Sequence, residues 1–423
     1  KEYNEHHPCV LANCEGNSQM SNPFTETALP QNGSPLRAID MEKDLFPVLP
    51  DQNFEGMNEY VSNVLPPDPV GDVSPFHYIQ MVNATPGSFF QIYDKEGNAI
   101  GPPTSPNVFW QPFNVTGFGD PIILFDHDAD RWLITEFGGF GTNVMLLALS
   151  ETSDPLGNWF AYEVQSPEFP DYPKFGIWNN GYFITTNEPT DENIPVYAVD
   201  REAMLAGAPT AAVQRLGVPK FGATTGAFQV LTPFTWEGNN PPPPGSPFYV
   251  VRIYDDAWEG GQDKLEIWEV HIDWDIPANS FTSGPIDIPL APFDSELCDN
   301  NIFTCIDQGE GTLVSALQHV IMYRVNYRNF GTHESVVLNF SVDVNGNNQA
   351  GIRWVELQKN QGEEWALRQE GTYAPDEHSR FMGSVNMDGS GNLLLAYSVT
   401  GGNELKPLSL KLPDALPMTP LVK

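Results

Sequence analysis

Short runs of apolar and aromatic residues, four to eight long, recur along the chain from His77 onward. Gly, Pro, Asn and Asp separate the runs, a pattern typical of β-strands joined by tight turns. Examples are HYIQMV, PIILFD, RWLITEF, NVMLLALS, FYVVRIYD, ESVVLNFSV and NLLLAYSV. Helical periodicity is nearly absent. The one helix we expect lies at Asp200 to Gly207, where Asp200 can cap the first turn and Gly207 can end the last.

Similar turns precede strands at a repeating interval, which indicates a repeat architecture. These turns open at Asp94, Asp126, Asn179 and Asp388. A period near 50 residues, with four strands per unit, predicts the blades of a single all-β propeller. The units begin near residues 75, 120, 171, 226, 311 and 379, so we expect about six blades, with seven as the alternative. Two or three tandem β-sandwiches are the competing fold, although no Ser/Thr-rich linker separates such units.

The ends of the chain differ in composition from this β-rich part. Residues 1–62 hold many turn formers and few alternating segments, so we expect an extended N-terminal arm. The predicted propeller covers residues 63–412, and residues 413–423 are expected to form a C-terminal tail.

Charge then limits the classes of partner. The 423 residues carry 55 Asp and Glu against 20 Lys and Arg, a formal charge of −35, with no basic run. Such a chain repels phosphate backbones, so nucleic acid is excluded as a partner. No apolar stretch approaches the roughly 20 residues that cross a bilayer, so no membrane span is predicted. The start at Lys1 leads us to expect an already processed chain.

The four cysteines form two local pairs in loop-like segments, Cys9 with Cys14 and Cys298 with Cys305. Four cysteines allow three connectivities, of which local pairing is the simplest. Disulfides favour a secreted, extracellular or cell-surface location. Four reduced thiols are the alternative, and no CxxC or paired His spacing supports a zinc site.

Several long blocks, covering about residues 63–400, resemble a family of large, secreted, mostly bacterial β-propeller-like proteins of unestablished activity. The blocks include PPDPVGDVSPFHYIQMVN, GDPIILFDHDADRWLITEF, PDYPKFGIWNNGYFITTNE, MYRVNYRNFGTHES and GTYAPDEHSRFMGSVNMDGSGN. The resemblance implies an exported propeller domain. This chain departs from the family pattern after Gly401, where relatives continue through another strand to a Gly-Arg ending.

Polar residues at the starts of the blades are the candidates for a binding site, because loops from successive blades meet at one mouth of a propeller channel. The candidates are Asp72, His77, Asp120, Asp171, Lys174, Arg252, Arg324 and Arg380. Together they would form a polar funnel suited to sugars or to an anionic group. The alternative is structural, since Asp often caps a turn and a strand Arg often pairs with such an Asp.

Paired carboxylates would support glycoside hydrolysis if one of the two has a raised pKa. The segment GDPIILFD resembles, more loosely, the Asp-Pro strand starts of five-bladed glycosidases. On that reading the acids are Asp72, Asp120 and either Glu188 or Glu334. No GxSxG motif supports a serine nucleophile.

Alternating oxygen ligands suggest a cation site. Asp126, Asp128 and Asp130 resemble the start of a calcium loop, but Arg131 occupies the sixth position, where such a loop has Gly. Because of these alternating carboxylates, calcium is the one cofactor that we expect. The sequence contains no motif for an organic cofactor. Trp110, Trp236 and Trp258 lie among Gly, Pro and Asn, which makes them the candidates for sugar stacking.

The leading hypothesis is a non-catalytic, extracellular binding, adhesion or surface-assembly propeller whose partner is a glycan or an extracellular protein. A carbohydrate-active hydrolase or lyase is the second hypothesis, with Asp72, His77, Asp120, Asp171 and Arg324 as its site. The third is a structural subunit that self-assembles through the arm or the tail.

Overall fold

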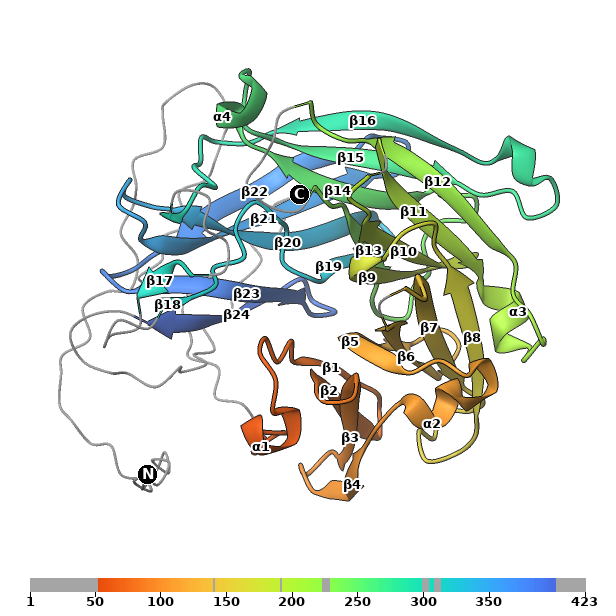
Figure 1. The fold of residues 1–423 in the computed structure, drawn as a ribbon. Helices are drawn as coiled ribbons and strands as arrows, with labels where there is room; N and C mark the ends of the chain where they lie inside the picture. The colour runs from red at the N-terminus through yellow and green to blue at the C-terminus, as the bar shows by residue number, and fades with distance from the viewer. Residues whose placement is uncertain are drawn as a thin grey trace, which may run out of the picture.

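The computed structural model describes residues 52–139, 141–190, 192–222, 229–298, 304–307 and 313–400. These residues form a series of antiparallel sheets arranged around a common centre (Figure 1). Most of the predicted arm, the end of the predicted propeller and the predicted tail lie outside the described residues, as do Cys9 and Cys14.

The first three sheets each contain four consecutive strands. The first sheet is β1 (Val70–Val73), β2 (His77–Asn83), β3 (Ser88–Asp94) and β4 (Ala99–Thr104). The second is β5 (Gly117–Asp126), β6 (Arg131–Gly138), β7 (Val144–Ser150) and β8 (Trp159–Gln165). The third is β9 (Asp171–Trp178), β10 (Gly181–Asn187), β11 (Asn193–Asp200) and β12 (Val213–Pro219).

The later sheets continue this order with more insertions. The fourth is β13 (Thr232–Trp236), β14 (Phe248–Tyr254), β15 (Lys264–His271) and β16 (Phe281–Pro289). The fifth is β19 (Val325–Asn329), β20 (His333–Asp343), β21 (Ala350–Asn360) and β22 (Ala366–Tyr373). In the described part of the chain, the sixth has two strands, β23 (Ser379–Met387) and β24 (Leu393–Thr400). A small hairpin of β17 (Ile306–Asp307) and β18 (Leu313–Val314) lies in the connection before β19.

Helices are short in the described residues. They are α1 (Glu59–Ser62), α2 (Asn107–Trp110), α3 (Arg201–Leu205) and α4 (Asp256–Glu259), with single 3-10 turns at Gln111–Phe113 and Pro277–Asn279. The predicted helix is confirmed as α3. The Asp200 carboxylate accepts a hydrogen bond from the Ala203 N–H, and Gly207 has a φ of 64° just past the helix end.

The first strand of each sheet adjoins the first strand of the next. This order runs from β1 to β5, β9, β13, β19 and β23, and β13 pairs with β19 in parallel. The approach is close enough that a Cβ on Gly176 of β9 would lie 2.3 Å from the Phe234 carbonyl oxygen of β13. The fold is therefore the predicted β-propeller rather than a row of sandwiches, and its first strands line the centre.

Apolar side chains fill the spaces between successive sheets. Ile79 and Phe90 of the first sheet pack with Trp132 of the second, and Phe183 of the third sheet stacks on Phe248 of the fourth. Fully burying one such side chain contributes about 1.5–3 kcal/mol. The strand β7 is buried at every position, as expected for a strand covered on both faces.

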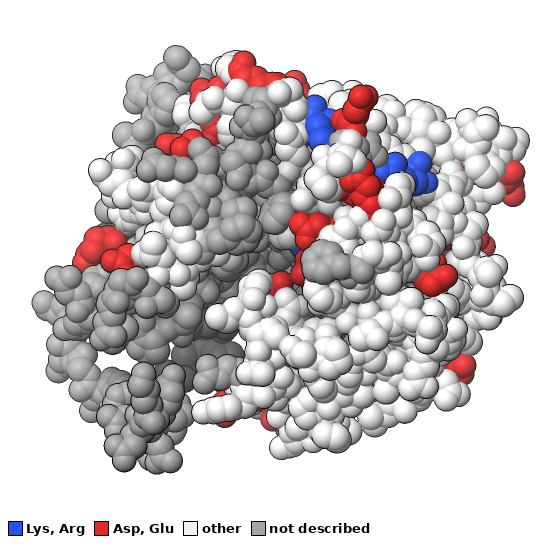
Figure 2. Space-filling model, viewed as in Figure 1, with Lys and Arg blue, Asp and Glu red and all other residues white. Residues whose placement is uncertain are grey.

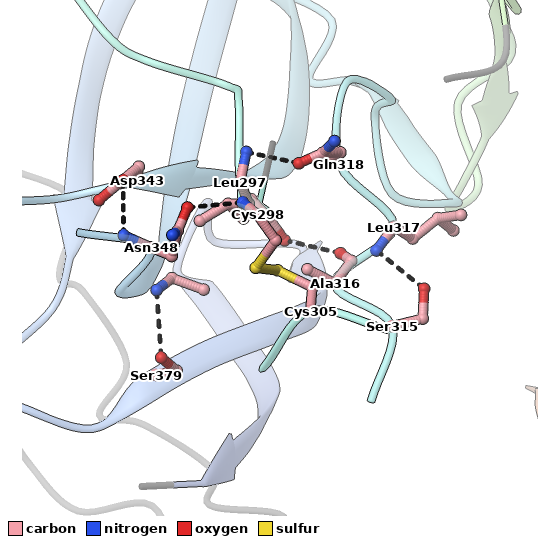
Figure 3. The surroundings of a disulfide bond; sticks show 12 residues. Leu297, Cys298, Cys305, Ser315, Ala316, Leu317, Gln318, Asp343, Asn348 and Ser379 are labelled. Carbon is pink, nitrogen blue, oxygen red and sulfur yellow. Dashed lines mark hydrogen bonds between the residues drawn. A yellow bond between two sulfur atoms is a disulfide. The ribbon is translucent and has the colours of Figure 1, made fainter. Parts of the chain in front are cut away.

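The predicted Cys298–Cys305 disulfide is confirmed, with the two Cα atoms 5.3 Å apart. Figure 3 shows how the bridged loop is held in place. The Leu297 N–H donates to the side-chain oxygen of Gln318, and the Cys298 N–H donates to the side-chain oxygen of Asn348. The disulfide thus closes a short loop before β19, and the hydrogen bond to Asn348 links that loop to the turn between β20 and β21. No helix among the described residues is long and apolar enough to span a bilayer.

Candidate functional site

Four charged or titratable residues, in or directly beside first strands, lie together at the centre of the ring. We call them the hub cluster: Asp72, His127, Glu237 and Arg324. Arg324 precedes β19, and its guanidinium lies 3.1 Å from Asp72 Oδ2 and 2.7 Å from Glu237 Oε1. His127 Nε2 lies 3.4 Å from Glu237 Oε2. The Asp72 carboxylate also accepts the backbone N–H groups of Val73 and Phe125.

The hub cluster is a paired network with many directed hydrogen bonds. Burial alone would raise the pKa of Glu237, but the hydrogen bond from His127 and the charge of Arg324 outweigh burial and lower it. Burial raises the pKa of Asp72 despite the nearby Arg324. The hydrogen bond to Glu237 raises the pKa of His127. This arrangement ties β1, β13 and β19 together and leaves Arg324 fully engaged.

A second cluster lies where the first strands of the first three sheets begin, and we call it the rim cluster: Asp68, Asn83, Asp120, Tyr172 and Lys174. Asp68, Asp120 and Tyr172 occupy equivalent positions. Each precedes a proline, and each has a left-handed backbone, with φ of 38°, 49° and 53°. Non-glycine residues rarely adopt this conformation, which stores local strain and concentrates at functional sites.

Asn83, at the end of β2, joins the two carboxylate-bearing strand starts. Its amide nitrogen donates to Asp68 Oδ2 at 2.9 Å, and its amide oxygen accepts the backbone N–H of Asp120 at 2.9 Å. The backbone N–H of Tyr172 donates to Asp120. Asp68 and Asp120 therefore have fixed positions relative to each other. Both residues are half-buried, so part of each remains accessible to solvent.

Electrostatics set the rim cluster apart from the hub. Burial raises the pKa of Asp120, Lys174 lowers it, and the charges of Asp68 and Asp171 add to the increase, so that the pKa is about 7. Burial also raises the pKa of Asp68 and lowers the pKa of Lys174. At neutral pH, Asp120 therefore exchanges a proton readily, which is what a general acid or base requires.

One side of the rim cluster is apolar. Tyr172 packs against Val230, Leu317, Val320 and Met322, which come from the segments leading into β13 and β19. Lys174 Nζ lies 3.5 Å from the centre of the Tyr172 ring and donates to the Pro173 carbonyl oxygen at 3.1 Å. The rim thus combines an apolar wall with carboxylates, a combination suited to a ligand with hydroxyl groups and hydrophobic ring faces.

The structure divides the predicted funnel residues among several places. Asp120 and Lys174 lie in the rim cluster, and Asp171 lies beside it, where its Oδ2 is 3.4 Å from Asn187 Nδ2. Asp72 and Arg324 lie in the hub cluster instead. A single funnel that gathers all eight residues is therefore not formed.

The other three funnel residues lie away from the rim. His77 starts β2, at the end of the β1–β2 hairpin opposite Asp68. Arg252 bonds Glu266 on the neighbouring strand β15, and Arg380 forms two hydrogen bonds with Asp376. These two arginines have the pairing of the structural alternative. Strand register places Glu266 opposite Arg252, and Asp376 lies four residues before Arg380 in the connection between β22 and β23.

Two of the three carboxylates in the predicted calcium loop are paired with an arginine. The guanidinium of Arg201 binds Asp126 at 2.7 Å and Asp128 at 2.8 Å, so a cation already neutralises these carboxylates, while Asp130 is exposed. Among the described residues, a different acidic group could hold a metal ion: Asp255, Asp256 and Asp263. The buried carboxylates of Asp255 and Asp263 also accept backbone N–H groups, as turn-capping residues do.

The remaining candidate acids and aromatics are internal. Glu188 bonds Arg215, and Glu334 accepts from the Tyr327 hydroxyl. Trp110 and Trp236 are buried, so neither is available for sugar stacking, whereas Trp258 is half-buried against Phe221. Trp110 donates to Glu136, a carboxyl whose pKa burial raises to about 7.

Sequence reasoning missed Asp68, Asn83 and Tyr172. A signal for two of them was present, because Asp68, Asp120 and Tyr172 each precede a proline and follow one another at intervals of 52 residues. Aligning the repeat on these X-Pro pairs, rather than on the hairpin turns, places all three at one level of the ring. Asn83 carries no comparable sequence signal.

No family model and no curated protein matches the chain, so the family resemblance stays a prediction. Solved structures with similarity include a polysaccharide lyase of family PL25, an ulvan lyase (12% identity, 82% of each chain, TM-score 0.40). An endo-arabinase from Bacteroides thetaiotaomicron is 12% identical over 71% of this chain and 93% of its own (TM-score 0.33). A Synechocystis apocarotenoid oxygenase mutant is 11% identical over 82% and 71% (TM-score 0.39). At these values the similarity does not identify a reaction or a substrate.

Proposed function

We propose that the protein is an extracellular carbohydrate-active enzyme whose acid–base site is the rim cluster. The observation that carries the proposal is a carboxyl, Asp120, with a pKa near 7, held beside a second carboxylate, Asp68, on a strained and half-buried strand start. Two acids in one site with different environments are the pattern used in glycoside cleavage. The Cys298–Cys305 disulfide supports the extracellular location.

In this proposal Asp120 is the proton donor to the leaving oxygen, because a carboxyl group with a pKa of about 7 is partly protonated at neutral pH. Asp68 is the second carboxylate, oriented by Asn83. Lys174 is a positioning residue that acts through its charge on Asp120. Tyr172 supplies an aromatic wall for a sugar ring.

The non-catalytic binding module expected from sequence is less well supported. The polar funnel expected as its binding site includes three arginines, whereas Arg252, Arg324 and Arg380 are engaged in internal ion pairs. Adhesion and assembly through the arm or tail stay predictions, since those segments lie outside the described residues.

The test is a screen of purified protein against polysaccharides, with detection of new reducing ends. We expect product from the wild type, loss of at least about a hundredfold in rate with Asp120→Asn, and a fall in rate as pH rises above 7. Asp130→Asn is the matched control, because Asp130 is also a left-handed Asp but is exposed in a turn. Equal rates for the two variants would refute the assignment of Asp120. Binding at the rim without cleavage by the wild type would support the binding module instead.

A further inference from the structure

The charge balance around the rim cluster restricts the ligands that it can accept. Two further carboxylates, Asp68 and Asp171, act on Asp120, against a single ammonium group, Lys174. In formal charge, three carboxyl groups stand against one ammonium group, so the group is negative overall. A ligand carboxylate brought to this site would meet like charges at short range.

Lys174 is not positioned to neutralise such a ligand. Its side chain is buried, its ammonium packs over the Tyr172 ring, and it donates to the Pro173 carbonyl oxygen. The charge of Lys174 acts on Asp120, Asp68 and Asp171 together. A uronate carboxylate is usually held by a fork of guanidinium donors, and the three predicted arginines are paired elsewhere in the fold.

The charge of the wider surface also disfavours anionic ligands. The chain has a formal charge of −35, and on the face shown in Figure 2 the Asp and Glu side chains outnumber the Lys and Arg side chains. The summed field of such a surface repels anionic polymers and slows their approach. Uncharged polymers do not experience this penalty.

We infer that the rim cluster selects uncharged glycans and cleaves them by hydrolysis rather than by elimination. This inference rests on the proposed function. Elimination from a uronate requires neutralisation of the substrate carboxylate, and in the described part of the rim the Lys174 ammonium is engaged by the Tyr172 ring and the Pro173 carbonyl oxygen. Hydrolysis instead develops positive charge at the anomeric carbon, which the surrounding carboxylates stabilise.

The step balances with water as the only co-reactant. The glycosidic C–O bond breaks as the Asp120 proton moves to the leaving oxygen. Water adds its oxygen to the anomeric carbon, and a carboxylate of the site accepts the proton that this water releases. A final proton transfer through solvent returns Asp120 to its starting state.

The experiment compares uronate polysaccharides with the same polymers after chemical reduction of their carboxyl groups, so that only charge differs between the paired probes. Binding of both forms is measured by calorimetry, and cleavage by reducing ends and by ultraviolet absorbance of unsaturated products. We expect the neutral form to be favoured by at least about tenfold at low salt, with the ratio shrinking as salt is added. No unsaturated product should appear.

Charge variants sharpen the result. Asp171→Asn removes one carboxylate beside Asp120, so the preference for the neutral form should narrow several-fold, while Asp130→Asn should leave it unchanged. Equal or better use of the uronate form, or any unsaturated product, would overturn the inference and leave the proposed function standing. Binding of the neutral form without cleavage would refute catalysis but support the selectivity. Binding of neither form would overturn both.

Discussion

The hub cluster and the rim cluster each combine buried carboxyl groups with one Arg or Lys side chain, and the two arrangements have opposite effects. In the hub, the Arg324 guanidinium lies within hydrogen-bonding distance of Asp72 and of Glu237, and His127 lies beside Glu237. In the rim, the Lys174 ammonium bonds a backbone carbonyl and an aromatic face, while three carboxylates share its charge at longer range. Directed pairing makes the hub structural. Burial, which Lys174 offsets only in part, raises the pKa of Asp120 to about 7.

The largest expected effect comes from breaking the hub. Arg324→Met leaves Asp72 and Glu237 buried without their cation, so the free energy of unfolding should fall by about 3–5 kcal/mol. Urea unfolding at neutral pH measures this. A loss below about 1 kcal/mol, the range of an exposed ion pair, would mean that the hub is not the structural element described above.

The same substitution at the rim should cost less. In Lys174→Met, Asp120 can relieve the lost neutralisation by keeping its proton, so we expect a loss of about 1–2 kcal/mol at neutral pH and a pKa of Asp120 above 7. Urea unfolding and a carboxyl titration by ¹³C NMR test both parts. A loss as large as that of Arg324→Met would remove the contrast between the clusters.

A pH series follows the rim cluster through the titration of Asp120. The pKa of Asp120 is raised in the folded protein, so its contribution to stability is present below its ordinary value of 3.8 and is lost as pH rises through about 7. Asp120→Asn should therefore gain about 2–3 kcal/mol relative to the wild type between pH 5 and pH 8. An unchanged difference across this window would contradict the raised pKa.

The smallest effect concerns the hub histidine. The raised pKa of His127 means that its contribution is present below 6.5 and is lost as pH rises through the folded-state value. His127→Gln should be less stable than the wild type by about 0.5–1 kcal/mol at pH 5 and nearly equal at pH 9. Thermal unfolding at the two pH values measures the difference, which should not reverse in sign.

Much of this fold could be predicted because its signals are local. Strand and turn residues alternate with a fixed period, so four of the six predicted blade starts, 75, 120, 171 and 379, lie within five residues of the observed first strands. The short disulfide and the capped helix α3 also depend on neighbouring residues alone. The starts near 226 and 311 were less accurate because inserts blur the repeat there.

The site was harder to predict because it depends on partners far apart in sequence. The sequence around an arginine does not show whether its side chain faces a channel or a carboxylate. Arg324 bonds Asp72, which lies 252 positions away in the chain. The spacing of Asp126, Asp128 and Asp130 predicts a calcium loop. It does not reveal that Arg201, 75 residues away, binds Asp126. Asp120, Asp171 and Lys174 could be chosen because blade starts converge in a propeller. Their pKa values depend on burial, which the sequence does not contain.

The most direct test of this account is the pKa of Asp120 in the folded protein. Carboxyl ¹³C NMR across pH 3 to 9, with the Asp120 resonance assigned by its absence in Asp120→Asn, measures it without any substrate. We predict a midpoint of about 7. A midpoint near the ordinary 3.8 would show an exposed, permanently ionised carboxylate and would contradict the rim cluster as an acid–base site.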